Sequence, residues 1–339
     1  MRRLVLFLFF VLLSVFLFFN KNNIDRDEIY ITGTTMGPLV YNIKYVSKDI
    51  RINKSDIDSL LILFNNIFST YQQTSYISTL NKSKSMEIVN PLFYNLLKES
   101  KKIYEATEGA FDPTVGPLVN AWGFGPLKKK NIPSKEEIDS IIKLVGFDKL
   151  YFDETIIEKN HKDSYIDFSS IAKGYAVDFI AKYFNDNNVK NYFIDIGGEV
   201  KCNGINSSGK IWNIGIENPF LENSSRKLIA SIPLKNLSLA TSGNYRNYYL
   251  NNDSIIVHTI NPKTGYPTES NMLSASVFSK DCFTSDAYAT AFMVLDFNKA
   301  KEISKKIDEI NVFLVYKDSL GNINTYVSPN LSDLIDIKK

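Results

Sequence analysis

The stretch Ile166-Asp-Phe-Ser-Ser-Ile-Ala-Lys-Gly-Tyr-Ala-Val-Asp178 joins a predicted strand to a predicted helix. Together with the segments on either side of it, this stretch predicts the fold class. The strand is expected to end at Phe168. Ser169 or Ser170 is expected to cap the helix, because helical spacing of apolar residues begins at Ile171.

Outward from this stretch, strands and helices follow one another irregularly. Helices are expected at residues 57–71, 91–107, 136–145, 170–184, 286–295 and 298–307. Strands are expected around the turns at Gly33 and Gly37 within 30–46, and at 150–152, 156–158, 165–168, 192–196, 211–217, 228–232, 255–260, 273–278 and 312–316. Because there is no regular βαβ alternation, the pattern predicts an α+β fold with a largely antiparallel sheet and flanking helices, in a single domain over residues 29–339.

The composition is that of an ordinary globular protein. The 339 residues are 44% hydrophobic and 22% charged, with a net charge of +2. This charge is too small for a nucleic-acid binder, and no basic stripe with interleaved aromatic residues is present.

The N-terminus has a composition of its own. Arg2 and Arg3 precede an apolar run from Leu4 to Phe19, so residues 1–20 are expected to be a signal peptide or a signal anchor, followed by a polar linker over 21–28. The alternative is a buried core helix. Since positive charge stays on the cytoplasmic side, the rest of the chain is predicted to lie at the extracytoplasmic face of the cytoplasmic membrane or in the periplasm.

Lys173 lies in the first turn of the helix that the opening stretch predicts, where the helix dipole disfavours a cation. Gly174 beside it weakens the helix by roughly 1 kcal/mol relative to alanine. Both features fit an anion docked at the helix start, with Lys173 paired to a phosphate and Gly174 giving it room. A solvated surface lysine is the competing interpretation.

A second pattern occurs in Thr284-Ser-Asp-Ala-Tyr-Ala-Thr-Ala-Phe-Met293. Thr284 or Ser285 is expected to cap a helix that begins near Asp286. Asp286 and Thr290 are four residues apart and share a helix face, and a carboxylate with a hydroxyl suits Mg²⁺. Alternatively, Asp286 only complements the helix dipole while Thr290 packs.

A third pattern is Val257-His-Thr-Ile-Asn-Pro-Lys-Thr-Gly-Tyr-Pro267, in which a strand carries His258 into a strong turn. Histidine is the usual general base near neutral pH, although a single histidine is more often structural. Three further segments, 109–114, 195–198 and 241–244, are typical of glycine-containing turns.

Several common motifs are absent from the sequence: G-x-G-x-x-G, H-E-x-x-H and C-x-x-C. Gly204, Gly209 and Lys210 have P-loop spacing, but Ile211 has no hydroxyl for a metal. Residues 206–209 are instead expected to form a hairpin turn that leads into a strand. Cys202 and Cys282 are expected to be unpaired thiols.

Taken in order, these segments resemble the ApbE family, the FAD:protein FMN transferases. The resemblance extends over nearly all of the chain after the N-terminal segment. It is carried by residues 33–37, 69–71, 109–114, 170–178, 195–198, 241–243, 258–267 and 286–290.

The resemblance implies a set of site residues. FAD would lie against Met36, Tyr71, Ala110, Phe111, Asp112, Lys173 and Ile260. Mg²⁺ would be held by Asp286, Thr290 and a backbone carbonyl at about Ser170. His258 would accept the proton of a target threonine, with Asp286 also catalytic.

The implied reaction moves FMN from FAD onto a threonine of an acceptor protein and releases AMP. The acceptors would be membrane electron-transfer subunits. Two rivals stay open: a FAD pyrophosphatase that releases FMN to water, and a non-catalytic periplasmic flavin-binding protein. A membrane-tethered scaffold is a third, less specific alternative.

Overall fold

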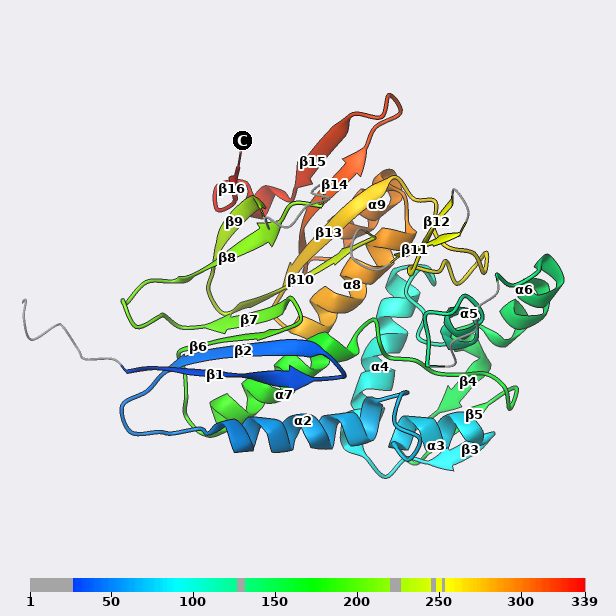
Figure 1. The fold of residues 1–339 in the computed structure, drawn as a ribbon, viewed down its shortest axis with the longest axis horizontal. Helices are drawn as coiled ribbons and strands as arrows, with labels where there is room; N and C mark the ends of the chain where they lie inside the picture. The colour runs from blue at the N-terminus through cyan, green and yellow to red at the C-terminus, as the bar shows by residue number, and fades with distance from the viewer. Residues whose placement is uncertain (1–26, 127–131, 220–226, 245–247, 252–253, 339) are drawn as a thin grey trace, which may run out of the picture.

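An eight-stranded antiparallel sheet runs through the centre of the protein (Figure 1). The computed structural model describes residues 27–126, 132–219, 227–244, 248–251 and 254–338. The strand order is β1-β2-β6-β7-β10-β13-β14-β15. Their bounds are Glu28–Thr35, Leu39–Val46, Tyr192–Ile196, Glu199–Asn203, Leu237–Gly243, Met272–Ser279, Asn311–Lys317 and Ile323–Val327. The predicted α+β class with a largely antiparallel sheet is therefore confirmed.

The first hairpin contains one turn rather than two. Met36 and Gly37 turn the chain with φ values of 49° and 85°. Gly33, expected in a turn, lies inside β1 opposite Tyr41. A Cβ at Gly33 would stand 2.5 Å from the Tyr41 hydroxyl, so this glycine makes room for the tyrosine ring.

Helices cover one face of the large sheet. Alternate residues of the strands, such as Ile43, Ile194, Val277 and Leu314, point into a core shared with these helices. The helices are α2 (Lys54–Phe68), α4 (Pro91–Ala106), α7 (Ala172–Asp186), α8 (Cys282–Val294) and α9 (Phe297–Lys306). All five were expected, with ends that shift by up to four residues.

A three-stranded sheet packs on the other face, with strand order β16-β9-β8. Its strands are Asp336–Ile337, Leu228–Leu234 and Trp212–Glu217. Trp212, Ile214 and Ile232 pack against Phe278 and Phe313 of the large sheet in a second core. The turn before β8 contains Gly209 at φ 74°, and the Gly209 N–H donates to the Asn206 carbonyl at 3.0 Å, so the expected turn into a strand is confirmed and the P-loop stays excluded. The turn does not close a hairpin, because β7 and β8 lie in different sheets.

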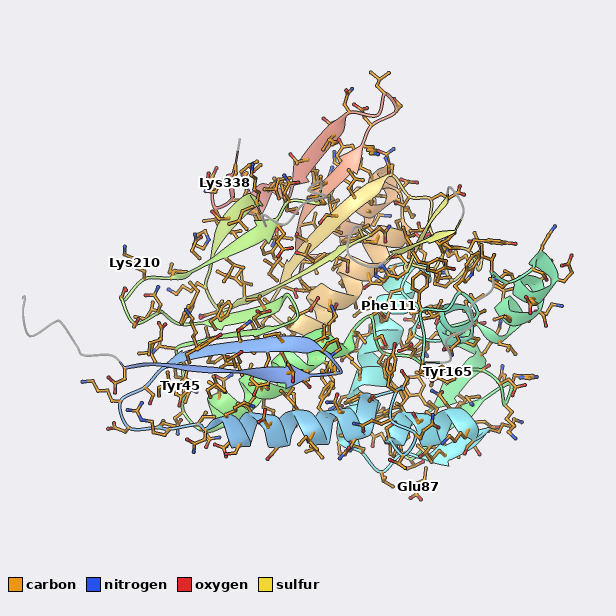
Figure 2. The ribbon with its side chains drawn as sticks, viewed as in Figure 1. Tyr45, Glu87, Phe111, Tyr165, Lys210 and Lys338 are labelled. Carbon is orange, nitrogen blue, oxygen red and sulfur yellow. The ribbon has the colours of Figure 1, made fainter. Side chains whose placement is uncertain are left out.

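The remaining elements gather beside one end of the large sheet, where Phe111 and Tyr165 are labelled in Figure 2. They are α3 (Tyr76–Lys82), α5 (Gly116–Ala121), α6 (Lys135–Ile141), β3 (Ser85–Glu87), β4 (Leu150–Phe152), β5 (Ile156–Lys159), β11 (Tyr248–Asn251), β12 (Ser254–Val257) and the short helices Ile142–Leu144 and Phe147–Lys149. The short helix Pro329–Leu331 lies instead on the side of β8 and β9, where Leu331 packs in the second core. The strand expected at 165–168 is wrong: within it only Tyr165 makes a bridge, to Val115.

Two further predictions concern the N-terminus and the cysteines. Residues 1–20 and most of the linker lie outside the described residues, and no helix within the described ranges is long and apolar enough to cross a membrane. Cys202 and Cys282 are buried and unpaired, as expected.

Candidate functional site

Helix α7 begins at Ala172, so Lys173 is its second residue and lies in the first turn as expected. The predicted serine cap is wrong. The N-cap position is Ile171, without a side-chain cap, because the Ser169 hydroxyl donates instead to the Asp167 carboxylate at 2.6 Å.

Helix α8 begins earlier than expected. It starts at Cys282 with Asp281 in the N-cap position, so Thr284 and Ser285 are not caps. Asp286 therefore lies beyond the first turn, where it contributes little to the helix dipole. Its carboxylate is 2% exposed and accepts a hydrogen bond of 2.9 Å from the backbone N–H of Gly174.

Helices α7 and α8 bring the predicted metal ligands together. The Thr290 hydroxyl lies 3.5 Å from the backbone carbonyl oxygen of Ser170. Lys173 Nζ lies 3.8 Å from Asp286 Oδ1 and 2.5 Å from Glu199 Oε1. We call Ser170, Lys173, Glu199, Asp286 and Thr290 the α7–α8 cluster.

Burial sets the charges of this cluster. Burial alone would lower the pKa of Lys173, but the carboxylates of Asp286 and Glu199 outweigh it and hold that pKa above its ordinary value. Burial raises the pKa of Asp286 and of Glu199, against the attraction of Lys173. Lys173 is 28% exposed, so of these three side chains it is the one that reaches the surface.

The cluster has the donor chemistry of a magnesium site. Its carboxylate, hydroxyl and carbonyl groups are hard oxygen ligands. One ammonium faces two carboxylates, and Glu199 Oε2 is buried with no hydrogen-bond partner in the described part of the chain. An added cation would balance this negative charge. Within the described ranges, no group of three or more His, Cys, Asp or Glu side chains is placed to hold a metal.

Gly174 has a different role from the predicted one. A Cβ on Gly174 would lie 2.4 Å from the carbonyl oxygen of Cys282 and 2.8 Å from the Cα of Phe283. The glycine therefore allows α7 to approach the backbone of α8, rather than making room for an anion.

The predicted FAD-binding residues at 110–112 follow α4 and are buried. The Asp112 carboxylate, 5% exposed, accepts hydrogen bonds from the backbone N–H of Thr114 at 2.8 Å and from its hydroxyl at 2.6 Å. Burial raises the pKa of Asp112 to about 6, although the Thr114 hydrogen bonds oppose the shift.

Tyr71 and His258 each contact Phe124, at a second place. The Tyr71 hydroxyl donates to the Phe124 carbonyl at 3.5 Å, and the tyrosine is 62% exposed. The His258 ring lies 6.3 Å from the Phe124 ring, between centroids. Ile260 packs nearby against Trp122.

A chain of contacts links His258 to the α7–α8 cluster. The hydroxyl of Thr259, the residue after His258, donates to the Asn244 side chain at 2.7 Å. Ser242 precedes Asn244 by two residues, and its hydroxyl oxygen lies 3.5 Å from the hydroxyl oxygen of Thr290. His258 and the cluster are thus joined through the end of β10. Met36, in the β1–β2 turn, and Tyr71, after α2, make no side-chain hydrogen bond to the cluster within the described ranges.

Glu199 is the residue that the sequence interpretation missed. It follows residues 195–198, which were interpreted as a turn and as one of the segments that carry the family resemblance, but which supplied no site residue. An available signal was the acidic residue placed directly after Gly197-Gly198 at the start of a strand.

Comparison with known proteins identifies the family of the chain. A model of the ApbE family matches residues 36–314. The chain belongs to the ApbE family. It is 35% identical over 302 residues to a FAD:protein FMN transferase of Vibrio cholerae, covering 87% of this chain and 89% of that relative. A FAD:protein FMN transferase of Haemophilus influenzae is also 35% identical, over 310 residues, covering 88% and 89%.

The ApbE fold is shared as well. The solved structure of the flavin transferase ApbE from Vibrio cholerae superimposes with a TM-score of 0.82 at 32% identity, covering 91% of this chain and 99% of that chain. The predicted resemblance to the ApbE family, and the prediction that the chain is an enzyme of the FAD:protein FMN transferase kind, are confirmed.

Proposed function

We propose that this chain transfers FMN from FAD to a threonine hydroxyl of an acceptor protein, with Mg²⁺ as cofactor and AMP as the second product. The observation that carries the proposal is the convergence of Ser170, Asp286 and Thr290 beside Lys173. Oxygen ligands next to a lysine suit a diphosphate bound with a divalent cation.

The transfer breaks one bond and forms one. The threonine oxygen attacks the phosphorus on the FMN side of the diphosphate, and the P–O bond to AMP breaks, so that its electron pair leaves with AMP. His258 accepts the threonine proton. Lys173 stabilises the negative charge that grows on the departing phosphate. When bound by Asp286, Thr290 and the Ser170 carbonyl, Mg²⁺ supplies further neutralisation of that charge.

The remaining residues hold the dinucleotide. Met36 and Tyr71 would contact FAD from the β1–β2 turn and from the end of α2, and Ile260 from the apolar group around Trp122. Residues 110–112 supply a rigid wall, since all three are buried.

The cellular setting is a separate part of the proposal. It rests on Arg2, Arg3 and the apolar run from Leu4 to Phe19, which favour a signal segment and an extracytoplasmic enzyme. Acceptors among membrane electron-transfer subunits would be within reach of an enzyme at that surface.

The test uses the full chain in detergent with FAD, MgCl₂ and a purified threonine-bearing acceptor domain of a membrane electron-transfer subunit. The wild type should add the mass of FMN to the acceptor and release AMP. Asp286→Ala should lower both rates by about 100-fold or more, because it removes a metal ligand at the reacting diphosphate. Omission of Mg²⁺ should do the same.

Two controls separate the rivals. An acceptor with valine in place of its target threonine should gain no FMN. AMP release without any gain of FMN mass on the acceptor would identify a FAD pyrophosphatase. FAD binding without AMP release would identify a non-catalytic flavin-binding protein.

A further inference from the structure

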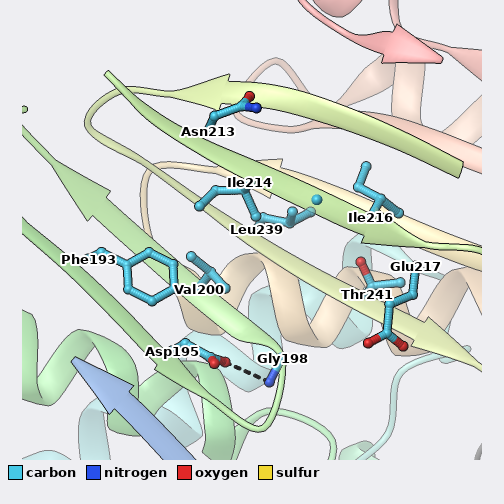
Figure 3. A pocket seen from close by; sticks show the side chains of 11 residues that line it. Phe193, Asp195, Gly198, Val200, Asn213, Ile214, Ile216, Glu217, Leu239 and Thr241 are labelled. Atoms are coloured by element: carbon cyan, nitrogen blue, oxygen red, sulfur yellow. Dashed lines mark hydrogen bonds between the residues drawn. The ribbon is translucent and has the colours of Figure 1, made fainter. Parts of the chain in front are cut away.

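A pocket of about 280 Å³ lies between the large sheet and β8 (Figure 3). The large sheet supplies alternate residues from three strands, Phe193 and Asp195 of β6, Val200 of β7, and Leu239 and Thr241 of β10, and Gly198 from the turn before β7. Because alternate residues share a face, these residues form one wall of the pocket.

Strand β8 supplies the opposite wall in a different way. Five consecutive residues, 213–217, line the pocket. Successive side chains of a strand point to opposite faces, so consecutive residues can all line a pocket only where it meets the backbone edge of the strand. β8 is the last strand of its sheet, and among the described strands it pairs only with β9. The pocket therefore adjoins an open strand edge.

The size and chemistry of the pocket suit a protein segment better than FAD. Sites for drug-sized ligands occupy roughly 300–1,000 Å³, so this pocket suits one or two side chains rather than a dinucleotide. Phe193, Val200 and Leu239 make its floor apolar. Asp195, fixed by hydrogen bonds from Gly198 N–H at 2.9 Å and Asn42 Nδ2 at 3.1 Å, adds a carboxylate, as does Glu217.

The pocket and the α7–α8 cluster share two strands. Gly198 lines the pocket, and the next residue, Glu199, contacts Lys173 at 2.5 Å. Thr241 lines the pocket, and the next residue, Ser242, lies 3.5 Å from Thr290 between hydroxyl oxygens. These residue pairs lie where β7 begins and where β10 ends, so the pocket and the proposed reaction centre lie on opposite faces of the large sheet at the same end of these strands. A segment held along β8 could therefore pass around this end of the sheet to the reaction centre.

We propose that this pocket docks an extended segment of the acceptor protein, which adds to the open edge of β8 and places apolar side chains against Phe193, Val200 and Leu239. Strand addition supplies main-chain hydrogen bonds, and the pocket selects side chains. The two carboxylates select a segment that lacks acidic residues and carries basic or neutral ones. This inference rests on the proposed transferase function.

The test fills the pocket without changing its charge. Val200→Phe in the full chain should raise the KM for the acceptor domain by about tenfold, while the KM for FAD stays unchanged. Because Val200 is also part of the second core, the variant should lose some stability but stay folded. Glu217→Lys reverses a charge at the pocket. It should weaken the binding of the same acceptor if the docked segment of that acceptor is basic. Glu87→Lys is the matched control, because Glu87 also ends a strand and lies far from the pocket (Figure 2).

A direct readout does not depend on turnover. Adding the acceptor domain to the wild type should slow amide hydrogen exchange over residues 213–217, and Val200→Phe should abolish this protection. An unchanged acceptor KM in a stably folded Val200→Phe variant would overturn the docking site, and so would a rise in the KM for FAD instead. Absence of FMN transfer by the wild type would instead overturn the proposed function.

Discussion

At the scale of single residues, burial decides what a charged side chain does. The sequence places Lys173 where a helix dipole disfavours a cation, and the structure surrounds it with two carboxylates that are each 2% exposed. Neither carboxylate is near Lys173 in sequence. The unusual lysine was predictable from the sequence, and the family resemblance placed Asp286 at the same site, but Glu199 was missed.

Asp112 gives a pH-dependent prediction at this scale. Burial raises its pKa from the ordinary 3.8 to about 6 in the folded protein. The free energy of unfolding is therefore highest below about pH 4, where Asp112 is protonated in both the folded and the unfolded protein. It falls as the pH rises through about 6, because the buried side chain must then ionise. Between pH 4.5 and 7.5 the loss should be about 2 kcal/mol.

The measurement is the free energy of unfolding in urea for wild type and Asp112→Asn. The amide keeps an acceptor for Thr114 but does not titrate. The variant's free energy of unfolding should therefore rise relative to that of wild type as the pH rises. Asp308→Asn, at an exposed position, controls for the change of side chain. A difference between wild type and Asp112→Asn that is equal at both pH values would contradict the assignment.

At the scale of elements, the contact between α7 and α8 builds the cluster. The Gly174 N–H binds Asp286, and the Asp178 carboxylate on the same helix accepts from the backbone N–H of Phe283 at 2.9 Å. Both bonds fix the start of α8 against α7, which keeps Thr290 beside the Ser170 carbonyl.

Gly174→Ala tests this contact. In an open helix the change would stabilise the protein by roughly 1 kcal/mol, but here the new Cβ meets backbone atoms of Cys282 and Phe283. We expect a net loss of about 1–3 kcal/mol in urea unfolding, together with slower FMN transfer.

Lys182→Ala is the matched control for Gly174→Ala, because Lys182 is an exposed residue of the same helix and should change stability by less than about 0.5 kcal/mol. Equal stability of the two variants would show that α7 and α8 do not need this close approach.

At the scale of the whole molecule, the large sheet separates two cores. Phe313 and Leu314 are neighbours on β14, yet Phe313 packs toward β8 and β9 while Leu314 packs toward the helices. The alternation of a strand thus divides the protein into a helical side and a side that holds the β8 pocket.

The pair Phe313→Ala and Leu314→Ala tests this division. Each should lower the free energy of unfolding by about 2–5 kcal/mol, because each leaves a cavity in a packed core. Native-state hydrogen exchange should separate them: Phe313→Ala should speed exchange in β8 and β9, and Leu314→Ala in α9. Faster exchange in the same elements for both variants would mean that the two cores are one.

The sequence by itself determined the fold class, the main helices and strands, and the family, because these depend on local periodicity and on motifs in a fixed order. It also predicted that Asp286 and Thr290 share a helix face, since that follows from helical spacing alone.

Only the tertiary structure decided what meets those residues. Glu199, 26 residues from Lys173 in the chain, reaches it because β7 passes beside the start of α7. A glycine is needed at position 174 because α8, more than a hundred residues away in the chain, packs against it. The edge of β8 is open because no strand in the described part of the chain pairs with it. Contacts between distant segments depend on how the sheet and helices pack, and local sequence patterns do not encode that packing.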